Sequence, residues 1–280
     1  MTGIQDLPRL AVVPVENLIL HEYHDHQRTP PLMDKLRVSG VLINPPIVSP
    51  FGDQEGHYMV LDGANRTFAF KELGIHHILV QILEVDDPNM DLNAWNHIIW
   101  GVSPETLCSQ LRKIPGVNFR TSVQAQTFLE LKDIHALASL HLPDGNAFTL
   151  LTPSFDLDSR VRMMNKVVTS YSEFAHIDRT SLYQINSLNN KYENLAGLII
   201  LPPFDVTDVM EVVGAGNLMP PGSTRFTIVP RVLHVNYPLE ELERDTSIEE
   251  KNKILEKFLF ILLENKRVRY YAEPTYIFDE

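Results

Sequence analysis

The chain has 280 residues, which is long enough for one large domain or for two domains of about 100 to 150 residues each. Hydrophobic residues make up 44% of the sequence and charged residues 21%, proportions that exclude disordered and fibrous classes. The formal net charge of −12 argues against a large basic groove for nucleic acid, because neutralising phosphates requires clustered Lys and Arg.

Two further features bear on location and redox chemistry. The apolar stretch over residues 10–15 is too short for a signal-peptide core or a membrane span, and Asp6 and Glu16 flank it. We therefore expect a cytoplasmic protein without a membrane segment. Cys108 is the only cysteine, which excludes an internal disulfide and an all-cysteine metal site, and we expect it to be a structural residue of a helix over residues 104–113.

The first part of the chain predicts a compact unit of strands and helices. Thr29 as N-cap and Pro30 in the first turn begin a helix, and Gly40 ends it. A turn-rich segment between two strand-like runs predicts a hairpin, whose second strand leads directly into a glycine loop. The expected elements are a strand over residues 10–20, a helix over 30–39, strands over 46–49 and 57–61, a helix over 67–73 and a strand over 78–83.

The rest of the chain predicts a second lobe. Residues 86–120 are less regular and are interpreted as the connection between lobes, and Ser247 with Glu250 forms a capping box that begins a long amphipathic helix. The expected elements are helices over residues 122–140, 159–174, 181–192, 206–213 and 248–266, and strands over 147–151, 198–201, 224–229, 232–235 and 269–278.

The glycine loop, Asp62-Gly63-Ala64-Asn65-Arg66, joins a predicted strand to a predicted helix. Such a turn brings free backbone N–H groups and the positive end of a helix dipole to one point, which favours a phosphate. Arg66 adds a planar, permanently charged fork, and Asp62 is a carboxylate that suits Mg²⁺. Ordinary turns use the same residues, so this short pattern alone does not identify a function.

The loop also resembles a family signature. Together with Tyr58-Met59-Val60-Leu61 before it and Phe70-Lys71-Glu72-Leu73-Gly74 after it, it is similar to the signature of the ParB/sulfiredoxin superfamily, and Asn44-Pro45-Pro46-Ile47-Val48 looks like that family's proline-bearing strand. Within the superfamily, the chain resembles the free L-serine kinases, both archaeal and of the type encoded in staphylococcal siderophore clusters. The segments that carry this resemblance are His21-Glu22, the glycine loop, Trp95-Asn96-His97, Thr224-Arg225-Phe226 and Val235-Asn236-Tyr237-Pro238-Leu239.

The resemblance implies a fold and an activity. The fold is α+β, with a ParB/sulfiredoxin-like nucleotide-binding lobe over residues 1–100 and a second α/β lobe over residues 101–280 that contributes substrate-binding residues. The activity is transfer of a phosphoryl group from ATP or ADP, with Mg²⁺, to the hydroxyl of free L-serine. The product, O-phospho-L-serine, would feed siderophore or related amino-acid precursor biosynthesis.

The resemblance also implies roles for individual residues. Glu22 carries over as the catalytic base, and Asp62 as a catalytic residue and Mg²⁺ ligand. The residues implied to bind the nucleotide phosphates are Gly63, Ala64, Asn65, Arg66 and Thr67, and those implied to bind serine are Trp95, His97, Thr224, Arg225 and Phe226.

Two positions depart from the family pattern. Asn65 stands where these kinases usually carry a histidine; an amide donates to a phosphate oxygen but carries neither a proton nor a positive charge at this position. Phe226 replaces a histidine of the archaeal type, whereas the siderophore-cluster type has phenylalanine there. The first departure bears on catalytic rate and the second on subfamily.

Other readings stay open at this stage. A ParB-like DNA-binding regulator that responds to nucleotide or haem is the alternative, although the net charge and the absence of a convincing helix-turn-helix weigh against nucleic acid. A haem would use histidine and Cys108 as axial ligands. Glu22 with His21, His24, Asp25 and His26 forms a possible zinc or iron site. The helix over residues 248–263 has enough apolar surface for the core or for a dimer interface, so the oligomeric state is open.

Overall fold

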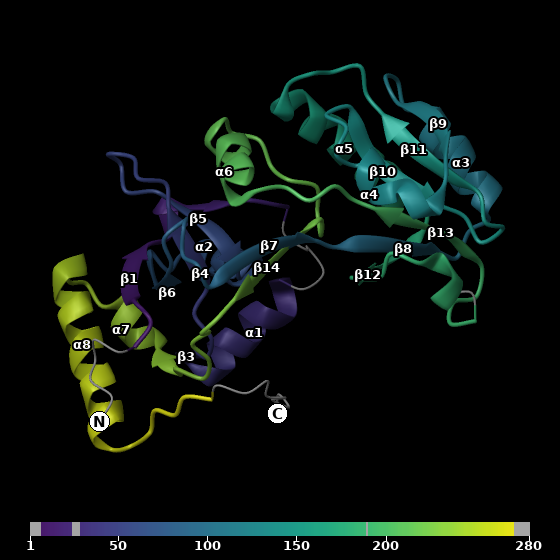
Figure 1. The fold of residues 1–280 in the computed structure, drawn as a ribbon. Helices are drawn as coiled ribbons and strands as arrows, with labels where there is room; N and C mark the ends of the chain where they lie inside the picture. The colour runs from purple at the N-terminus through teal and green to yellow at the C-terminus, as the bar shows by residue number, and fades with distance from the viewer. Residues whose placement is uncertain (1–6, 24–28, 189, 272–280) are drawn as a thin grey trace.

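The computed structural model describes residues 7–23, 29–188 and 190–271. It contains two large β-sheets, each accompanied by helices, which confirms the predicted α+β class. Figure 1 shows the two sheets at opposite ends of an elongated molecule, with long strands passing between them. No helix in these ranges is both long and apolar enough to cross a membrane.

The first sheet has five strands in the order β1-β6-β4-β5-β2. Its buried core includes Val48, Val60, Phe70 and Leu79, each fully excluded from solvent. The predicted hairpin is confirmed, because β4 and β5 pair antiparallel. The elements of this unit are β1 Leu10–Pro14, β2 Leu18–Leu20, α1 Thr29–Ser39, β4 Ile47–Pro50, β5 Tyr58–Asp62, α2 Ala64–Leu73 and β6 His77–Ile82.

The predicted strand over residues 10–20 is divided into two strands. A 3-10 turn, η2 Val15–Asn17, interrupts it, and β1 and β2 then lie at opposite edges of the sheet. β1 pairs antiparallel with β6, whereas β2 pairs parallel with β5. The turn therefore carries the chain from one edge to the other and brings residues 21 and 22 to the end of β5.

The second sheet has six strands in the order β12-β8-β13-β10-β11-β9. Helices α3 and α5 pack on it and against each other, and α6 packs on α5. The elements are β8 Asn96–Trp100, α3 Pro104–Arg112, β9 Asn118–Ser122, β10 Ala136–His141, β11 Ala147–Leu151, α5 Leu157–Ser172, β12 His176–Thr180, β13 Leu195–Ile200 and α6 Val206–Gly214.

Two predicted helices in this part of the chain are wrong. The helix over residues 122–140 is replaced by the end of β9, a turn and a short helix (η3 Gln124–Gln126, α4 Thr127–Glu130), and then β10. All six residues of β10 are buried, so the strand has no polar alternation that would distinguish it from a helix. The helix over residues 181–192 shrinks to the single turn η4 Ile185–Ser187.

The strand predicted over residues 232–235 is absent, because side chains and not a neighbouring strand hold this segment. The Val232 N–H donates to Gln81 Oε1 at 2.9 Å, and the His234 N–H donates to Asn44 Oδ1 at 2.8 Å. The strand predicted over residues 269–278 lies mostly outside the described residues. The supposed connection over residues 86–120 contains β7 Met90–Ala94 as well as β8, α3 and β9.

The carboxyl-terminal part of the chain returns to the first sheet. β14 Thr224–Ile228 pairs with β7, and β15 Tyr237–Pro238 pairs with β3 Val41–Leu42. Helices α7 Leu239–Glu243 and α8 Ile248–Glu264 contact β6 and β1 respectively (Figure 1). The division at residue 100 stays a prediction, and these contacts attach residues 224–264 to the first unit.

Candidate active site

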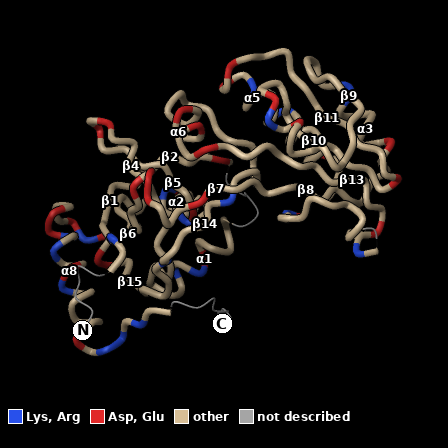
Figure 2. The backbone as a smooth tube through the Cα atoms, viewed as in Figure 1, with Lys and Arg blue, Asp and Glu red and all other residues tan. Residues whose placement is uncertain are grey.

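A cavity of about 470 Å³ lies where the end of β5 meets segments from distant parts of the chain. One wall is the glycine loop, and another is formed by His21, Glu22 and Tyr23 after β2. Helix α1 and residues 41–44 add Lys35 and Asn44, and Arg179 of β12 comes from the second sheet. The cavity is therefore lined by both signs of charge, and Figure 2 shows acidic and basic residues interspersed along the backbone as a whole.

The glycine loop requires its glycine. Gly63 has a φ of 99°, in the left-handed region, and a Cβ there would lie 2.9 Å from the Pro46 Cβ. α2 begins at the next residue, Ala64, and no side chain caps its amino end. The amino end of α2 therefore meets the cavity wall without a capping side chain, and the helix dipole there favours negative charge.

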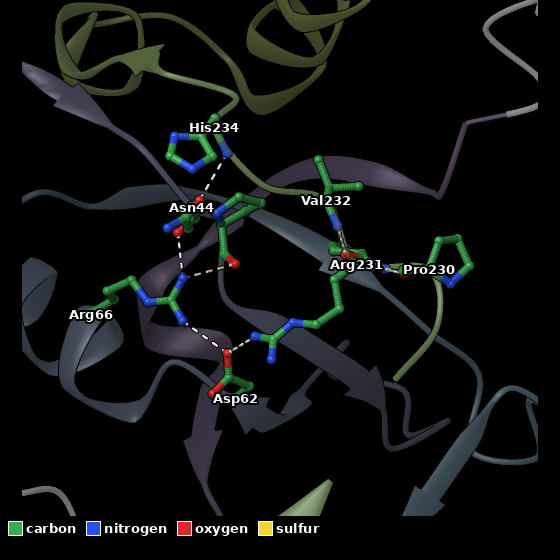
Figure 3. Close-up of polar contacts among 9 residues, drawn as sticks. Asn44, Asp62, Arg66, Pro230, Arg231, Val232 and His234 are labelled. Atoms are coloured by element: carbon green, nitrogen blue, oxygen red, sulfur yellow. Dashed lines mark hydrogen bonds and ion pairs between the residues drawn. The ribbon is translucent and has the colours of Figure 1, made fainter. Parts of the chain in front are cut away.

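Asp62 lies between two arginines at this loop. Arg66 donates from Nη2 to Asp62 Oδ2 at 2.9 Å and from Nη1 to the carbonyl oxygen of Asn44 at 2.6 Å, while Arg231 pairs with the same Asp62 oxygen (Figure 3). Burial lowers the pKa of the Arg66 guanidinium, and the charge of Asp62 opposes that shift. Arg66 thereby ties the loop to residue 44, and Arg231 attaches the returning chain to it.

The glycine loop offers one suitable Mg²⁺ ligand, the carboxylate of Asp62. This ion is usually held by one or two carboxylates together with substrate phosphates and waters. Asp62 lines the cavity beside the amino end of α2, and its Oδ2 atom accepts hydrogen bonds from both Arg66 and Arg231. Among the described residues, no group of three or more His, Cys, Asp or Glu side chains gathers at one point. The predicted His24, Asp25 and His26 ligands lie outside the described residues.

Glu22 is clamped by a turn over residues 219–224. Its Oε2 atom accepts from the Gly222 N–H at 3.0 Å and contacts Thr224 Oγ1 at 3.1 Å. The neighbouring His21 ring contacts the Val60 carbonyl oxygen through Nδ1 at 2.5 Å and Thr224 Oγ1 through Nε2 at 2.7 Å. The carboxylate is thus fixed by residues about 200 positions later in the sequence.

The same turn is held from the side of the second sheet. His97 of β8 is buried, and its Nε2 atom lies 2.9 Å from the Gly222 carbonyl oxygen while Nδ1 lies 2.6 Å from the Tyr171 hydroxyl. Burial lowers the pKa of His97 to about 4, so the ring is neutral near pH 7. The Trp95 N–H donates to the Ser223 carbonyl oxygen at 2.9 Å. His97 therefore supports the turn and does not line the cavity.

The structure brings together six of the predicted site residues in the cavity lining, namely Glu22, Asp62, Gly63, Ala64, Asn65 and Arg66. The others lie elsewhere. Thr67 is fully buried in α2, and Thr224 lies behind Glu22. The Arg225 guanidinium stacks on the Trp95 ring at 4.5 Å, and Phe226 packs edge-on against His21; none of these three lines the cavity.

Sequence reasoning missed several lining or supporting residues. Asn44 stands in the Asn-Pro-Pro segment that was noted only as a strand, and Arg231 follows a proline that gave no signal. Lys35 lies on the correctly predicted helix α1. Arg179 had no signal at all, because β12 is a short and largely exposed edge strand without an apolar pattern.

Known proteins resemble this chain in sequence and in fold. No protein-family model matches the chain. It is 25% identical over 97% of its length to the ATP-dependent L-serine kinase SbnI of Staphylococcus aureus, of which it covers 97%. It is 34% identical over 37% of its length to the ATP-dependent L-serine kinase of Staphylothermus marinus, of which it covers 40%.

Solved structures of these kinases share the fold. A carboxyl-terminally truncated SbnI from Staphylococcus aureus superposes with a TM-score of 0.69 at 25% identity, covering 91% of this chain and 97% of that one. A free serine kinase in complex with AMP gives a TM-score of 0.69 at 16% identity, covering 83% of this chain and 93% of that one. The predicted resemblance to free serine kinases is confirmed, and the chain is a homologue of them.

Proposed function

We propose that this protein is a free L-serine kinase that transfers the γ-phosphoryl group of ATP to the serine hydroxyl and releases O-phospho-L-serine. The observation that carries the proposal is that Glu22 and the uncapped amino end of α2 line one cavity. Full-length similarity to an ATP-dependent L-serine kinase supports the choice of donor and acceptor. ADP as the donor, also predicted from the sequence, is tested in the same experiment.

In this proposal Glu22 is the general base. The Gly222 N–H donates to its Oε2 atom, and the Thr224 hydroxyl contacts the same atom. No described residue donates to its Oε1 atom. Oε1 would accept the hydroxyl proton of serine as the hydroxyl oxygen attacks the transferring phosphorus. Phosphoryl transfer requires chiefly positioning and charge neutralisation, together with one group that orients or deprotonates the nucleophile.

The glycine loop forms the donor side. The N–H groups at the start of α2 would hold the nucleotide phosphates, and Asn65 would donate an amide hydrogen without adding charge. Asp62 would hold Mg²⁺, whose contribution is to neutralise charge on the phosphates. A cytoplasmic location, as predicted from the sequence, would give such an enzyme access to nucleotide and free amino acids.

The test is a direct assay of product. Purified protein is incubated with Mg²⁺, L-serine and either ATP or ADP, and O-phosphoserine is followed by mass, with Glu22→Gln beside the wild type. Loss of a general base typically lowers the rate by about 10² to 10⁴. We expect the variant to fall by this factor while it binds nucleotide as the wild type does.

Two outcomes would contradict the proposal. Absence of product with either donor would contradict the kinase activity, and Asn65→His would then show whether the family histidine restores it. An unchanged rate in Glu22→Gln would contradict the assignment of the base but not the activity. Glu16→Gln, on η2, serves as the matched control, because its acid lies outside the cavity lining.

A further inference from the structure

We propose that Arg179 binds the carboxylate of the acceptor amino acid and so makes the enzyme select free serine over amino alcohols that lack this group. The inference deepens the proposed kinase function and rests on it. Arg179 lies on β12, at the edge of the second sheet, and its register partner on β8 is His97. It is the one residue of the second sheet in the described lining of the cavity.

The position of Arg179 is set by a close approach to Gly222. A Cβ built on Gly222 would lie 2.3 Å from Arg179 Nε and 2.7 Å from its Cζ, so only glycine leaves room for the guanidinium. The N–H of this same glycine donates to Glu22 Oε2. The backbone of one residue therefore separates a permanent positive charge from the carboxylate proposed as the base.

The other cations near the cavity have partners or lie on other walls. Arg66 and Arg231 share Asp62, and Arg225 stacks on Trp95 outside the lining. Lys35 is on α1, which packs against α2 and so lies on the side of the glycine loop. Within the described residues the Arg179 side chain has no ion pair or hydrogen bond, which leaves its guanidinium donors for a substrate.

The chemistry of serine fits this arrangement. Its hydroxyl and its carboxylate are separated by only two carbon atoms, so the group that binds the carboxylate must lie next to the group that deprotonates the hydroxyl. Arginine presents a planar fork that matches a carboxylate with two parallel hydrogen bonds. With the carboxylate on Arg179, the hydroxyl of serine is directed to Glu22, which lines the same cavity as the glycine loop.

The test compares L-serine with ethanolamine, which retains the amine and the hydroxyl but lacks the carboxylate. kcat/KM is measured for both substrates in the wild type, Arg179→Ala and Arg179→Lys. We expect Arg179→Ala to lower kcat/KM for L-serine by about 10- to 100-fold, the effect of losing hydrogen bonds to a charged group. Turnover of ethanolamine and the KM for ATP should stay within about threefold, and Arg179→Lys should recover part of the loss on L-serine.

The control variant and the result that would overturn this inference differ from those used to test the proposed function. Arg162→Ala removes another arginine of the second lobe, on α5 and outside the cavity lining, and should change neither substrate. Equal losses on L-serine and ethanolamine would overturn the inference and would place Arg179 on the transferring phosphoryl group instead.

A second measurement keeps the inference testable if the wild type phosphorylates neither substrate. Calorimetric titration with L-serine in the presence of ADP then decides: binding to the wild type that is lost in Arg179→Ala supports the carboxylate site, although the proposed kinase function falls. Equal binding to both proteins, or none to either, overturns the inference.

Discussion

The Thr224 hydroxyl contacts two polar groups at once. His21 Nε2 lies 2.7 Å from the hydroxyl oxygen, and Glu22 Oε2 lies 3.1 Å from it. On its other side, His21 Nδ1 lies 2.5 Å from the Val60 carbonyl oxygen. The hydroxyl therefore bridges the His21 ring and the Glu22 carboxylate, so the three groups form a chain of polar contacts.

These contacts predict that Thr224 positions the proposed base, whereas the sequence predicted that it binds serine. Thr224→Val removes the hydroxyl, and we expect kcat to fall by about 10- to 100-fold because a hydrogen bond to a charged group is lost. The KM for L-serine should change little, and Thr224→Ser should retain most of the activity. A rise in KM with kcat unchanged would favour direct contact with serine instead.

The residues that could be predicted at the site are those with a local signal. Gly63 occupies a strand-to-helix turn that only a glycine fits. Glu22 belongs to the short His21-Glu22 motif of the family pattern. Arg179 and Arg231 reach the site through long-range packing, from an exposed edge strand and from a returning loop. No local pattern marks such residues, because their function depends on what the fold brings next to them.

At the scale of elements, capping residues predicted helices correctly, whereas a fully buried strand was predicted as a helix. Ser247 accepts a hydrogen bond from the backbone N–H of Glu250, and the helix predicted from this pair is present. The helix predicted over residues 104–113 is also present, with Ser103 as its N-cap. The strand β10 lost its alternation through complete burial and was predicted as part of a helix. Capping is decided within four residues, whereas the choice between a buried strand and a buried helix depends on the neighbouring strands.

The junction of α7, α8 and β6 depends on one buried lysine. Lys251 is 2% exposed, and its Nζ atom donates to the Leu242 carbonyl oxygen at 2.6 Å and contacts His77 Nδ1 at 3.0 Å. Burial lowers the pKa of Lys251, and burial together with the charge of Lys251 lowers that of His77, which leaves its ring able to accept. The lysine satisfies a carbonyl at the end of α7 that would otherwise lack a donor.

Replacing this lysine tests its part in holding the helices. Lys251→Met keeps the length of the side chain but leaves the Leu242 carbonyl oxygen unpaired, so we expect the free energy of unfolding to fall by about 1 to 3 kcal/mol. Lys253→Met, on the exposed side of the same helix, should change it by no more than about 0.5 kcal/mol. Urea denaturation of the two variants measures the difference, and equal midpoints would contradict the assignment.

At the scale of the molecule, one turn joins the two sheets and carries the site. Residues 219–224 contact Glu22 from the first unit, His97 from β8 and Arg179 from β12. A change in any of these three contacts therefore reaches both the link between the sheets and the proposed base. Of these three residues, His97 has a pKa that burial lowers to about 4.

We expect this link to make the protein sensitive to acid. In the folded protein Nε2–H of the neutral His97 ring donates to the Gly222 carbonyl oxygen, and Nδ1 accepts from the Tyr171 hydroxyl. Its folded pKa of about 4 lies below the ordinary value of 6.5, so the unfolded chain takes up the proton first as pH falls. The titration of His97 alone should leave stability unchanged above about pH 7 and should lower it by about 3 kcal/mol between pH 6.5 and pH 4.

The measurement is the free energy of unfolding in urea at several pH values between 7.5 and 4, for the wild type and His97→Gln. The variant should be less stable at neutral pH but should lose less stability on acidification. His141, whose pKa burial also lowers to about 4, supplies the part of the pH dependence that remains in His97→Gln. If the two proteins lost stability in parallel over this range, His97 would not be the group that titrates. Because protonation of His97 removes the acceptor of the Tyr171 hydroxyl beside the Gly222 turn, activity should decline reversibly over the lower part of the same range.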